Sequence, residues 1–263
     1  DPDNPNTGEV WFNATDAVLK FQYQNTTSAW STGNNLNTAK GSLAGAGIQT
    51  AALAFGGNPG SKNETELYNG TSWTEVNNLP AARSNHSGTG TQTAALAYGG
   101  YPNVNTSVHY DGTNWTAGGN LVAGRELLSD GIGTQTAALA AGGYIRSPDS
   151  FVTNSEEYNG SSWAEGNNLN TARYGPGGFG TQTAAVCHGG ITTAQLANTE
   201  EYDGTSWTAG NDFPTTIYAM GGCGTQTTGL TCGGYSPAAP NANTTITGEY
   251  DGTNWTTGGA MIQ

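Results

Sequence analysis

Catalysis needs acids, bases or nucleophiles at short spacing, and this sequence offers few of them. Its three histidines, His86, His109 and His188, have no cysteine or aspartate partners at the spacing of metal ligands. Two carboxylate pairs, Glu156-Glu157 and Glu200-Glu201, have the residue type of a glycosidase acid pair, but they recur in register on a predicted strand. One member of each pair should therefore point to solvent. Because the motifs of serine hydrolases, zinc proteases and phosphate-binding loops are also absent, we expect no catalytic residues, no metal, no cofactor and no enzymatic activity.

The charge balance limits the partners of the protein. The 263 residues include 7 Lys and Arg against 20 Asp and Glu, which gives a net charge of −13. Such a field repels phosphate backbones and anionic lipids, so we expect neither nucleic-acid nor membrane-surface binding. No apolar run approaches the ~20 residues that a membrane span needs. The 7 Trp and 12 Tyr argue against disorder, which the 41 Gly alone would allow.

The three cysteines do not form a disulfide framework or a zinc motif. Cys187, Cys223 and Cys232 stand outside any Cys-x-x-Cys pair or Cys/His cluster. We interpret them as small buried strand residues. A single bridge, Cys223–Cys232 or Cys187–Cys232, stays open as an alternative.

A repeat of about 45 residues organises the chain, and repeats of this length indicate propeller blades or solenoids. A tyrosine turn, Tyr-Asn-Gly or Tyr-Asp-Gly, precedes most of the repeated tryptophans, and a second marker of the type Thr-Gln-Thr-Ala-Ala-Leu-Ala-x-Gly-Gly lies between them. The repeated tryptophans are Trp30, Trp73, Trp115, Trp163, Trp207 and Trp255.

Each repeat translates into four short antiparallel strands. The run Thr-Ala-Ala-Leu-Ala-Tyr-Gly-Gly at 93–100 is short, apolar and ended by Gly-Gly, as expected for a strand buried on both faces. The segment Thr106–Tyr110 ends at Asp-Gly, a strong hairpin signal, and the next strand begins near Trp115. A further strand precedes Thr91, for example over Asn85–Gly90. Four-stranded units without helical periodicity predict an all-β propeller, and a solenoid is the weaker alternative.

The order of these markers resembles the kelch motif. Leu79-Pro80-x-x-Arg83 is followed by Gly99-Gly100, Tyr110-Asp111 and Trp115, and the pattern recurs five times over residues 36–257. The resemblance implies a kelch-like β-propeller in which Gly-Gly ends the second strand of each blade. It also implies that the tyrosines and tryptophans pack between blades. We therefore expect five of the tryptophans to be structural repeat positions: Trp73, Trp115, Trp163, Trp207 and Trp255.

Low charge and the Thr-Gln-Thr turn make the repeats similar to the kelch-type repeats of phage tail proteins. Residues 8–21, Gly-Glu-Val-Trp-Phe-Asn-Ala-Thr-Asp-Ala-Val-Leu-Lys-Phe, also resemble a hairpin of phage fibre proteins. These resemblances imply a non-enzymatic structural and adhesion module of a phage tail or an extracellular surface fibre. They place the protein on a virion surface or outside the cell, as a homo-oligomer or fibre that binds a cell-surface glycan or receptor.

Scarce cations collect at one position of the repeat. Arg83, Arg125 and Arg173, like Lys40, stand four residues after the recurrent leucine, whereas the fifth repeat has Ile217. We interpret the arginines as structural, each pairing with a carboxylate or a backbone carbonyl inside its blade. A cationic ring that binds an anion is the alternative, which the isoleucine weakens.

The two ends of the chain bear on how the ring closes. Residues 1–8 read as a flexible acidic segment, 9–32 as N-terminal strands and 33–263 as the propeller repeats. Glu9–Asn13, Val18–Tyr23 and Ala29–Thr32 align with strands two to four of a blade. We predict five complete blades and a sixth composite blade, closed by these strands and the region of Met261. The alternative is five blades with a protruding N-terminal hairpin that exposes strand edges to another chain.

The loops after Gly-Gly vary most between repeats and form one rim of the predicted disk. They carry Tyr101, Tyr144 and Tyr235, whose rings could stack on sugars, together with Arg146. We predict these four residues to bind ligand, and a carbohydrate-binding lectin is therefore the alternative function. The sequence also contains N-x-Ser/Thr sequons such as Asn69 and Asn159, which would be glycosylation sites if the source were a eukaryotic secretory pathway.

Overall fold

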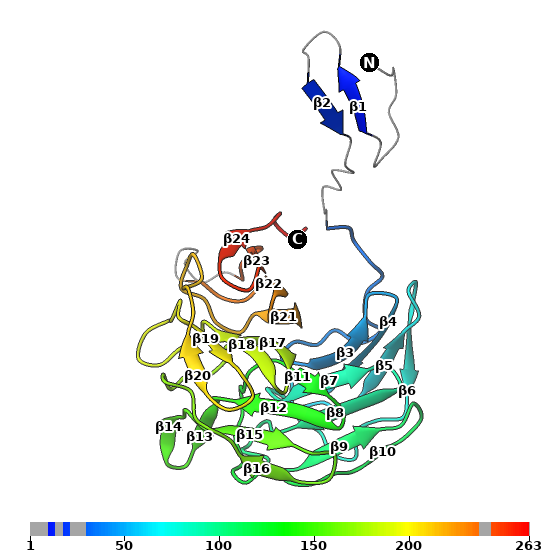
Figure 1. Cartoon of the computed structure of the whole chain (residues 1–263). Helices are drawn as coiled ribbons and strands as arrows, with labels where there is room; N and C mark the ends of the chain where they lie inside the picture. The colour runs from blue at the N-terminus through cyan, green and yellow to red at the C-terminus, as the bar shows by residue number, and fades with distance from the viewer. Residues whose placement is uncertain (1–9, 14–17, 22–29, 237–242, 263) are drawn as a thin grey trace. The chain divides into compact units, whose positions relative to one another are not determined.

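Residues 32–263 form an all-β propeller of five blades (Figure 1). The structure is a computed structural model, and it describes residues 10–13, 18–21, 30–236 and 243–262. Each blade is a four-stranded antiparallel sheet whose strands follow one another in space as they do in sequence. Among these residues no helix has the length and apolar character that crossing a membrane would require.

The blade boundaries follow the sequence repeat. The first three blades are β3 (Ala44–Ile48), β4 (Ala51–Phe55), β5 (Thr65–Tyr68) and β6 (Trp73–Val76); β7 (Ser87–Thr91), β8 (Ala94–Tyr98), β9 (Ser107–Tyr110) and β10 (Trp115–Ala117); and β11 (Ile132–Thr134), β12 (Ala137–Ala141), β15 (Ser155–Tyr158) and β16 (Trp163–Glu165). The last two are β17 (Gly177–Thr181), β18 (Ala184–His188), β19 (Thr199–Tyr202) and β20 (Trp207–Ala209); and β21 (Gly221–Thr225), β22 (Thr228–Cys232), β23 (Thr247–Tyr250) and β24 (Trp255–Thr257).

Turn chemistry explains where the strands of a blade stop. In blade 2 the hydroxyl of Thr91 accepts a hydrogen bond from the Ala94 N–H at 3.1 Å and closes the first turn. Strand β8 ends at Tyr98. The next residue, Gly99, has a φ of 68° and no room for a side chain, because a Cβ there would lie 2.8 Å from the Arg125 carbonyl oxygen. Asp111 then accepts hydrogen bonds from the N–H groups of the next turn, which returns the chain as β10.

Neighbouring blades pack through apolar faces made of the recurrent residues. Leu53 and Phe55 of blade 1 lie in one buried cluster with Leu79, Tyr110 and Trp115, which blade 2 and its incoming connection supply. The Phe55 and Trp115 rings meet edge to face at 5.0 Å, a favourable aromatic geometry. Three further clusters repeat this arrangement up to blade 5.

Two polar bridges accompany each of these four apolar contacts. The indole N–H of each tryptophan donates to a hydroxyl on the third strand of the preceding blade, as Trp115 does to Thr65 at 3.1 Å and Trp255 to Thr199 at 2.9 Å. The glutamine of each Thr-Gln-Thr turn donates to two carbonyls of the preceding blade, as Gln226 does to Ala185 and Tyr202. Trp115, Trp163, Trp207 and Trp255 are therefore buried framework residues between blades.

In three blades a buried ion pair holds the connection that leads into the first strand of the blade. Arg125 pairs with Glu156 at 2.5 Å, Arg173 with Glu200 at 2.6 Å and Lys40 with Glu66 at 3.0 Å. The same glutamates accept backbone N–H groups of the connection, as Glu156 does from Val122 at 2.7 Å. These cations are therefore enclosed within single blades, and they do not form an exposed cationic ring.

The other two blades lack both the glutamate and the ion pair. Blade 2 has Val108 in place of the glutamate, and Arg83 donates instead to the carbonyl and hydroxyl oxygens of Thr106. Burial lowers the pKa of Arg83 to about 10. Blade 5 has Ile217 and Gly248 and so has lost both partners together. A buried charge without a partner is costly; blade 2 offsets this cost with the oxygens of Thr106, and blade 5 has neither charge.

No sixth four-stranded sheet occurs among the described residues, and the composite blade, several of whose residues lie outside them, stays a prediction. Strand β1 (Val10–Asn13) pairs with β2 (Val18–Phe21) in a separate two-stranded sheet. Neither Trp30–Thr32 nor Ala260–Ile262 is in a strand, so the ends supply no inner strand to complete a ladder. Glu9, residues 22–29 and the acidic segment 1–8 lie outside the described residues.

The cysteines are free, so neither of the two disulfides left open is formed. Cys187 is a buried strand residue, as predicted, and burial raises the pKa of its thiol to about 12. Cys223 is exposed, which corrects the expectation for that residue. It lies on β21, and no further blade of the described structure covers this strand.

Removing one member of a buried ion pair should destabilise the propeller more than removing both. We expect Arg173→Ile to lower the free energy of unfolding by about 3–5 kcal/mol, because Glu200 stays buried without its cation. Adding Glu200→Val should restore at least half of this loss, since blade 5 already has Ile217 at the cation position and blade 2 has Val108 at the glutamate position. Urea unfolding of the two single variants and the double variant measures the coupling. If the losses of unfolding free energy in the two single variants simply add in the double variant, the two residues do not stabilise the fold as a pair.

Candidate binding surface

One face of the propeller carries the loops that vary between repeats. Because the strands are antiparallel, the loop after the second strand and the connection entering the first strand lie at the same end of a blade. Single bridges tie the two together, as between Glu126 and Tyr144, and between Tyr218 and Tyr235. In blade 3 the loop, one of those that vary between repeats, extends into a hairpin of β13 (Tyr144–Arg146) and β14 (Asp149–Phe151).

Aromatic residues from blades 2 to 5 form a continuous row on this face. The Arg146 guanidinium lies over the Tyr101 ring at 4.6 Å and near the Tyr144 ring at 5.8 Å. The row continues through ring contacts of Tyr144–Phe151 at 5.7 Å, Phe151–Tyr174 at 5.2 Å, Tyr174–Tyr218 at 6.2 Å and Tyr218–Tyr235 at 5.2 Å. We call these seven side chains the aromatic row: Tyr101, Arg146, Tyr144, Phe151, Tyr174, Tyr218 and Tyr235.

The aromatic row is held in place but still open to solvent. Tyr101 is 40% exposed, and the other rings are half-buried. Arg146 is fixed by Glu126, whose buried carboxylate lies 2.5 Å from its Nε, and its backbone N–H donates to Asn103. The Tyr144 hydroxyl donates to Asp149 at 2.6 Å. A ligand would therefore meet preorganised rings with polar groups at their edges.

The structure brings the four predicted ligand-binding residues into this single row. Whether they bind a ligand stays a prediction. The sequence reasoning missed Phe151, Tyr174 and Tyr218, which link the four across the blades. Two of them could have been found from the sequence. Tyr174 and Tyr218 each directly follow the repeat position of the cations, as Glu126 does in blade 3.

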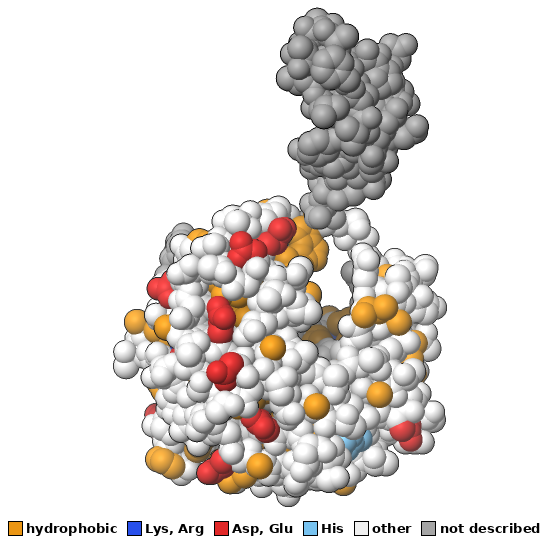
Figure 2. Space-filling model, in the orientation of Figure 1, with side chains coloured by type: hydrophobic (Ala, Val, Ile, Leu, Met, Phe, Trp, Pro, Cys, Tyr) orange, Lys and Arg blue, Asp and Glu red, His pale blue; other side chains and the backbone are white. Residues whose placement is uncertain are grey.

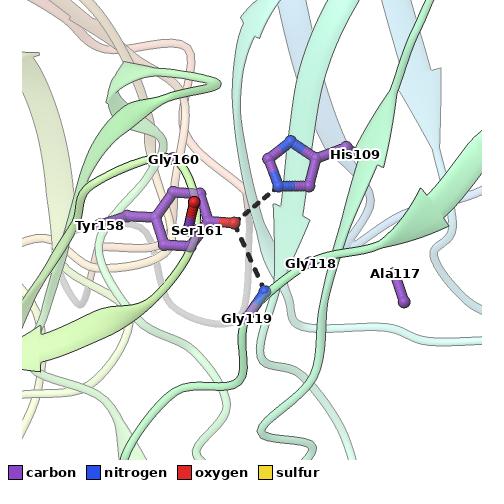
Figure 3. A pocket seen from close by; sticks show the side chains of 7 residues that line it. All are labelled: His109, Ala117, Gly118, Gly119, Tyr158, Gly160 and Ser161. Carbon is purple, nitrogen blue, oxygen red and sulfur yellow. Dashed lines mark hydrogen bonds between the residues drawn. The ribbon is translucent and has the colours of Figure 1, made fainter.

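A shallow groove of about 520 Å³ opens between blades 2 and 3, away from the aromatic row (Figure 3). The Tyr158 hydroxyl lies 2.6 Å from Nε2 of His109 and accepts the Gly119 N–H at 3.4 Å. In the next two interfaces the same hydroxyl position contacts a glutamate, as Tyr202 does with Glu157 at 2.5 Å. Burial lowers the pKa of His109. His109 thus takes the place that a glutamate occupies in the next two interfaces, as the hydrogen-bond partner of the tyrosine hydroxyl.

The other candidates for chemistry are structural as well. Glu156 and Glu200 are buried in the ion pairs, whereas Glu157 and Glu201 are half-buried and bind tyrosines of the next blade. The two carboxylates of each pair therefore point to opposite sides of their strand. The described residues contain no group of His, Cys, Asp and Glu that could hold a metal ion.

His86 and His188 lie in apolar surroundings between blades. The His188 ring is 4.5 Å from Trp255 and 5.5 Å from Phe213. Among the described residues, neither histidine has a hydrogen-bond partner for its ring nitrogens. Burial, with a smaller effect of the nearby arginine, lowers the pKa of each to about 3, so both are neutral near pH 7. They are core residues, not acids or bases.

The comparisons with known proteins name no relative. No protein-family model matches the chain, and no curated protein sequence matches it. A functional assignment therefore depends on the geometry described above.

The buried His188 should make the protein sensitive to acid. Its pKa is lower in the folded protein than in the unfolded chain, so its contribution is complete above about pH 6.5 and is lost as the pH falls toward 3. Between pH 7 and pH 5 the loss should be about 2 kcal/mol. We expect His188→Phe, which introduces the residue found at Phe55, to remove this loss.

Urea unfolding of both proteins at pH 7, 6 and 5 measures the effect, because the comparison at each pH cancels the contributions of other groups. Parallel pH profiles would show that His188 is not buried in its neutral form.

Proposed function

We propose that this chain is a non-enzymatic structural and adhesion module of a surface fibre, on a virion tail or outside a cell, and that its receptor is a glycan. The observation that carries the proposal is the aromatic row. The kelch-type pattern of the repeats and their similarity to those of phage tail proteins support the fibre setting. The positions between blades support the proposal too. Their side chains are buried in the framework, so the loops are the part of the propeller available for binding.

A sugar fits the aromatic row for chemical reasons. Aromatic rings present flat apolar faces to the C–H groups of a pyranose, and their hydroxyls and neighbouring polar groups can bond its hydroxyls. Tyr101, Tyr144 and Tyr235 lie along the same aromatic row, so several residues of an oligosaccharide could be held at once. An extended ligand then gains affinity from several weak contacts.

Charge favours a neutral glycan. The net charge is −13, and Figure 2 shows acidic side chains spread over one face of the propeller. Arg146, the cation of the aromatic row, is already paired with Glu126. An anionic polysaccharide would meet repulsion without a free cation in the row to offset it.

We expect Tyr144→Ala and Tyr101→Ala each to weaken glycan binding about fivefold to tenfold, which corresponds to ~1–1.4 kcal/mol per lost ring contact. A glycan array identifies the ligand, and isothermal titration of that ligand measures the change. Ile48→Ala is a matched control, because Ile48 is an apolar residue that is 68% exposed and lies at the other end of its blade. Failure of the array to give any hit, or equal losses in control and aromatic-row variants, would refute glycan binding by this surface.

A further inference from the structure

One face of the hairpin β13–β14 carries both rings and charges of the aromatic row. In the register of the hairpin, Tyr144 pairs with Phe151 and Arg146 pairs with Asp149. Side chains that are directly paired, or that lie two residues apart on one strand, point to the same face of a two-stranded sheet. The two rings therefore lie at the base of this face, where they contact Tyr174, and the two charged groups lie at its tip.

The guanidinium of Arg146 is held by one of its nitrogens and leaves the other two open. Its Nε lies 2.5 Å from the buried carboxylate of Glu126, which also accepts a hydrogen bond from the Asn85 amide at 3.3 Å. The guanidinium lies over the Tyr101 ring, and 47% of the Arg146 side chain is exposed. Among the described residues, neither Nη1 nor Nη2 has a hydrogen-bond partner. A positioned pair of N–H donors is therefore available to a ligand, although Glu126 offsets the charge.

Asp149 supplies an acceptor beside these donors. Its Oδ1 accepts the Tyr144 hydroxyl at 2.6 Å, and its Oδ2 has no hydrogen-bond partner in the described part of the chain. The residue is exposed. Arg146 and Asp149 are direct cross-strand partners, yet they form no ion pair with each other. The donors and the acceptor therefore stand apart at the hairpin tip, with the rings of Tyr101 and Tyr144 close to the donors.

An acetamido group matches this arrangement in three ways. Its carbonyl oxygen accepts hydrogen bonds, its N–H donates one on the opposite side, and its flat amide and methyl group can pack on an aromatic ring. A sugar hydroxyl can also donate and accept, but it offers neither the flat face nor the methyl group. The acetamido group is uncharged, in keeping with the net charge of −13 that disfavours an anionic glycan.

We propose that the tip of the hairpin β13–β14 is the subsite of the aromatic row that selects N-acetylated hexosamines. Arg146 donates from its Nη groups to the acetamido carbonyl, and Asp149 accepts the acetamido N–H. Tyr101 and Tyr144 pack against the sugar and its methyl group. This inference rests on the proposed function, because it names the class of sugar that the same surface binds.

A set of β-1,4-linked trisaccharides that differ only at the second carbon of each sugar tests the preference in the full-length protein. They are the trimers of N-acetylglucosamine, glucosamine and glucose, and isothermal titration at about 150 mM salt gives the dissociation constant of each. We expect the acetylated trimer to bind at least about tenfold more tightly than the glucose trimer, because the glucose trimer lacks the amide that makes the two polar contacts. The glucosamine trimer separates the effect of charge, because its cations are attracted to the acidic protein without offering an amide.

Arg146→Lys and Asp149→Asn test the two polar contacts. Lysine keeps a positive charge beside Glu126 but has no second nitrogen for a ligand, and asparagine places an NH₂ group where one carboxylate oxygen stood. We expect each variant to reduce the preference for the acetylated trimer over the glucose trimer to about threefold or less. Glu165→Gln is the matched control, because it also removes one exposed carboxylate from blade 3, on β16, and it should keep the full preference.

Equal affinities for the acetylated and glucose trimers, or an unchanged preference in both variants, would overturn the inference. Tighter binding of the glucosamine trimer than of the acetylated trimer would overturn it too, because charge and not the amide would then select the sugar. Hits on the glycan array that all lack an acetamido group would overturn the inference and leave glycan binding in place. An array without any hit would refute the proposed function itself, and the inference with it.

Discussion

The structure depends on one contact, the packing of each blade's apolar face against the next blade. Blade 1 buries Leu53 and Phe55 only because Trp115 and Tyr110 of blade 2 cover them, and the same dependence passes along the chain. A single four-stranded sheet of this composition has too little core to be stable alone, so stability is shared between neighbours. The indole and glutamine bridges add direction to this packing, because each donor must find an acceptor on the preceding blade.

The low charge of the chain follows from the residues that the blades and their interfaces use. Buried cations occur where a glutamate of the same blade can pair with them, and a blade that lacks the glutamate satisfies the arginine with neutral oxygens or replaces it with isoleucine. The interfaces themselves use aromatic rings, small residues and amides. As a result the residues at the framework positions are needed for packing. The residues that differ between repeats lie in the loops on the face that carries the aromatic row.

Much of the fold could be predicted from the sequence, because the repeat fixes strand order, the Gly-Gly and Asp-Gly turns, and the tryptophan framework. Two features could not. The aromatic row joins Tyr101 to Tyr235 through residues of four blades, and no periodic signal states which loops become neighbours across blades. Ring closure could not be predicted either, because Trp30 and Met261 carry the repeat marks of a sixth blade, yet neither of them lies in a strand. A repeat pattern specifies what a blade looks like, but it does not specify how the ring closes.

The central claim is that neighbouring blades stabilise one another through the buried clusters between them. Hydrogen–deuterium exchange of the Trp163→Ala variant tests this claim most directly, because Trp163 belongs to blade 3 and packs on blade 2. We expect peptides of β8 and β9 in blade 2 to lose protection together with those of β15 and β16 in blade 3. Loss of protection confined to blade 3, with β8 and β9 exchanging as slowly as before, would contradict the claim.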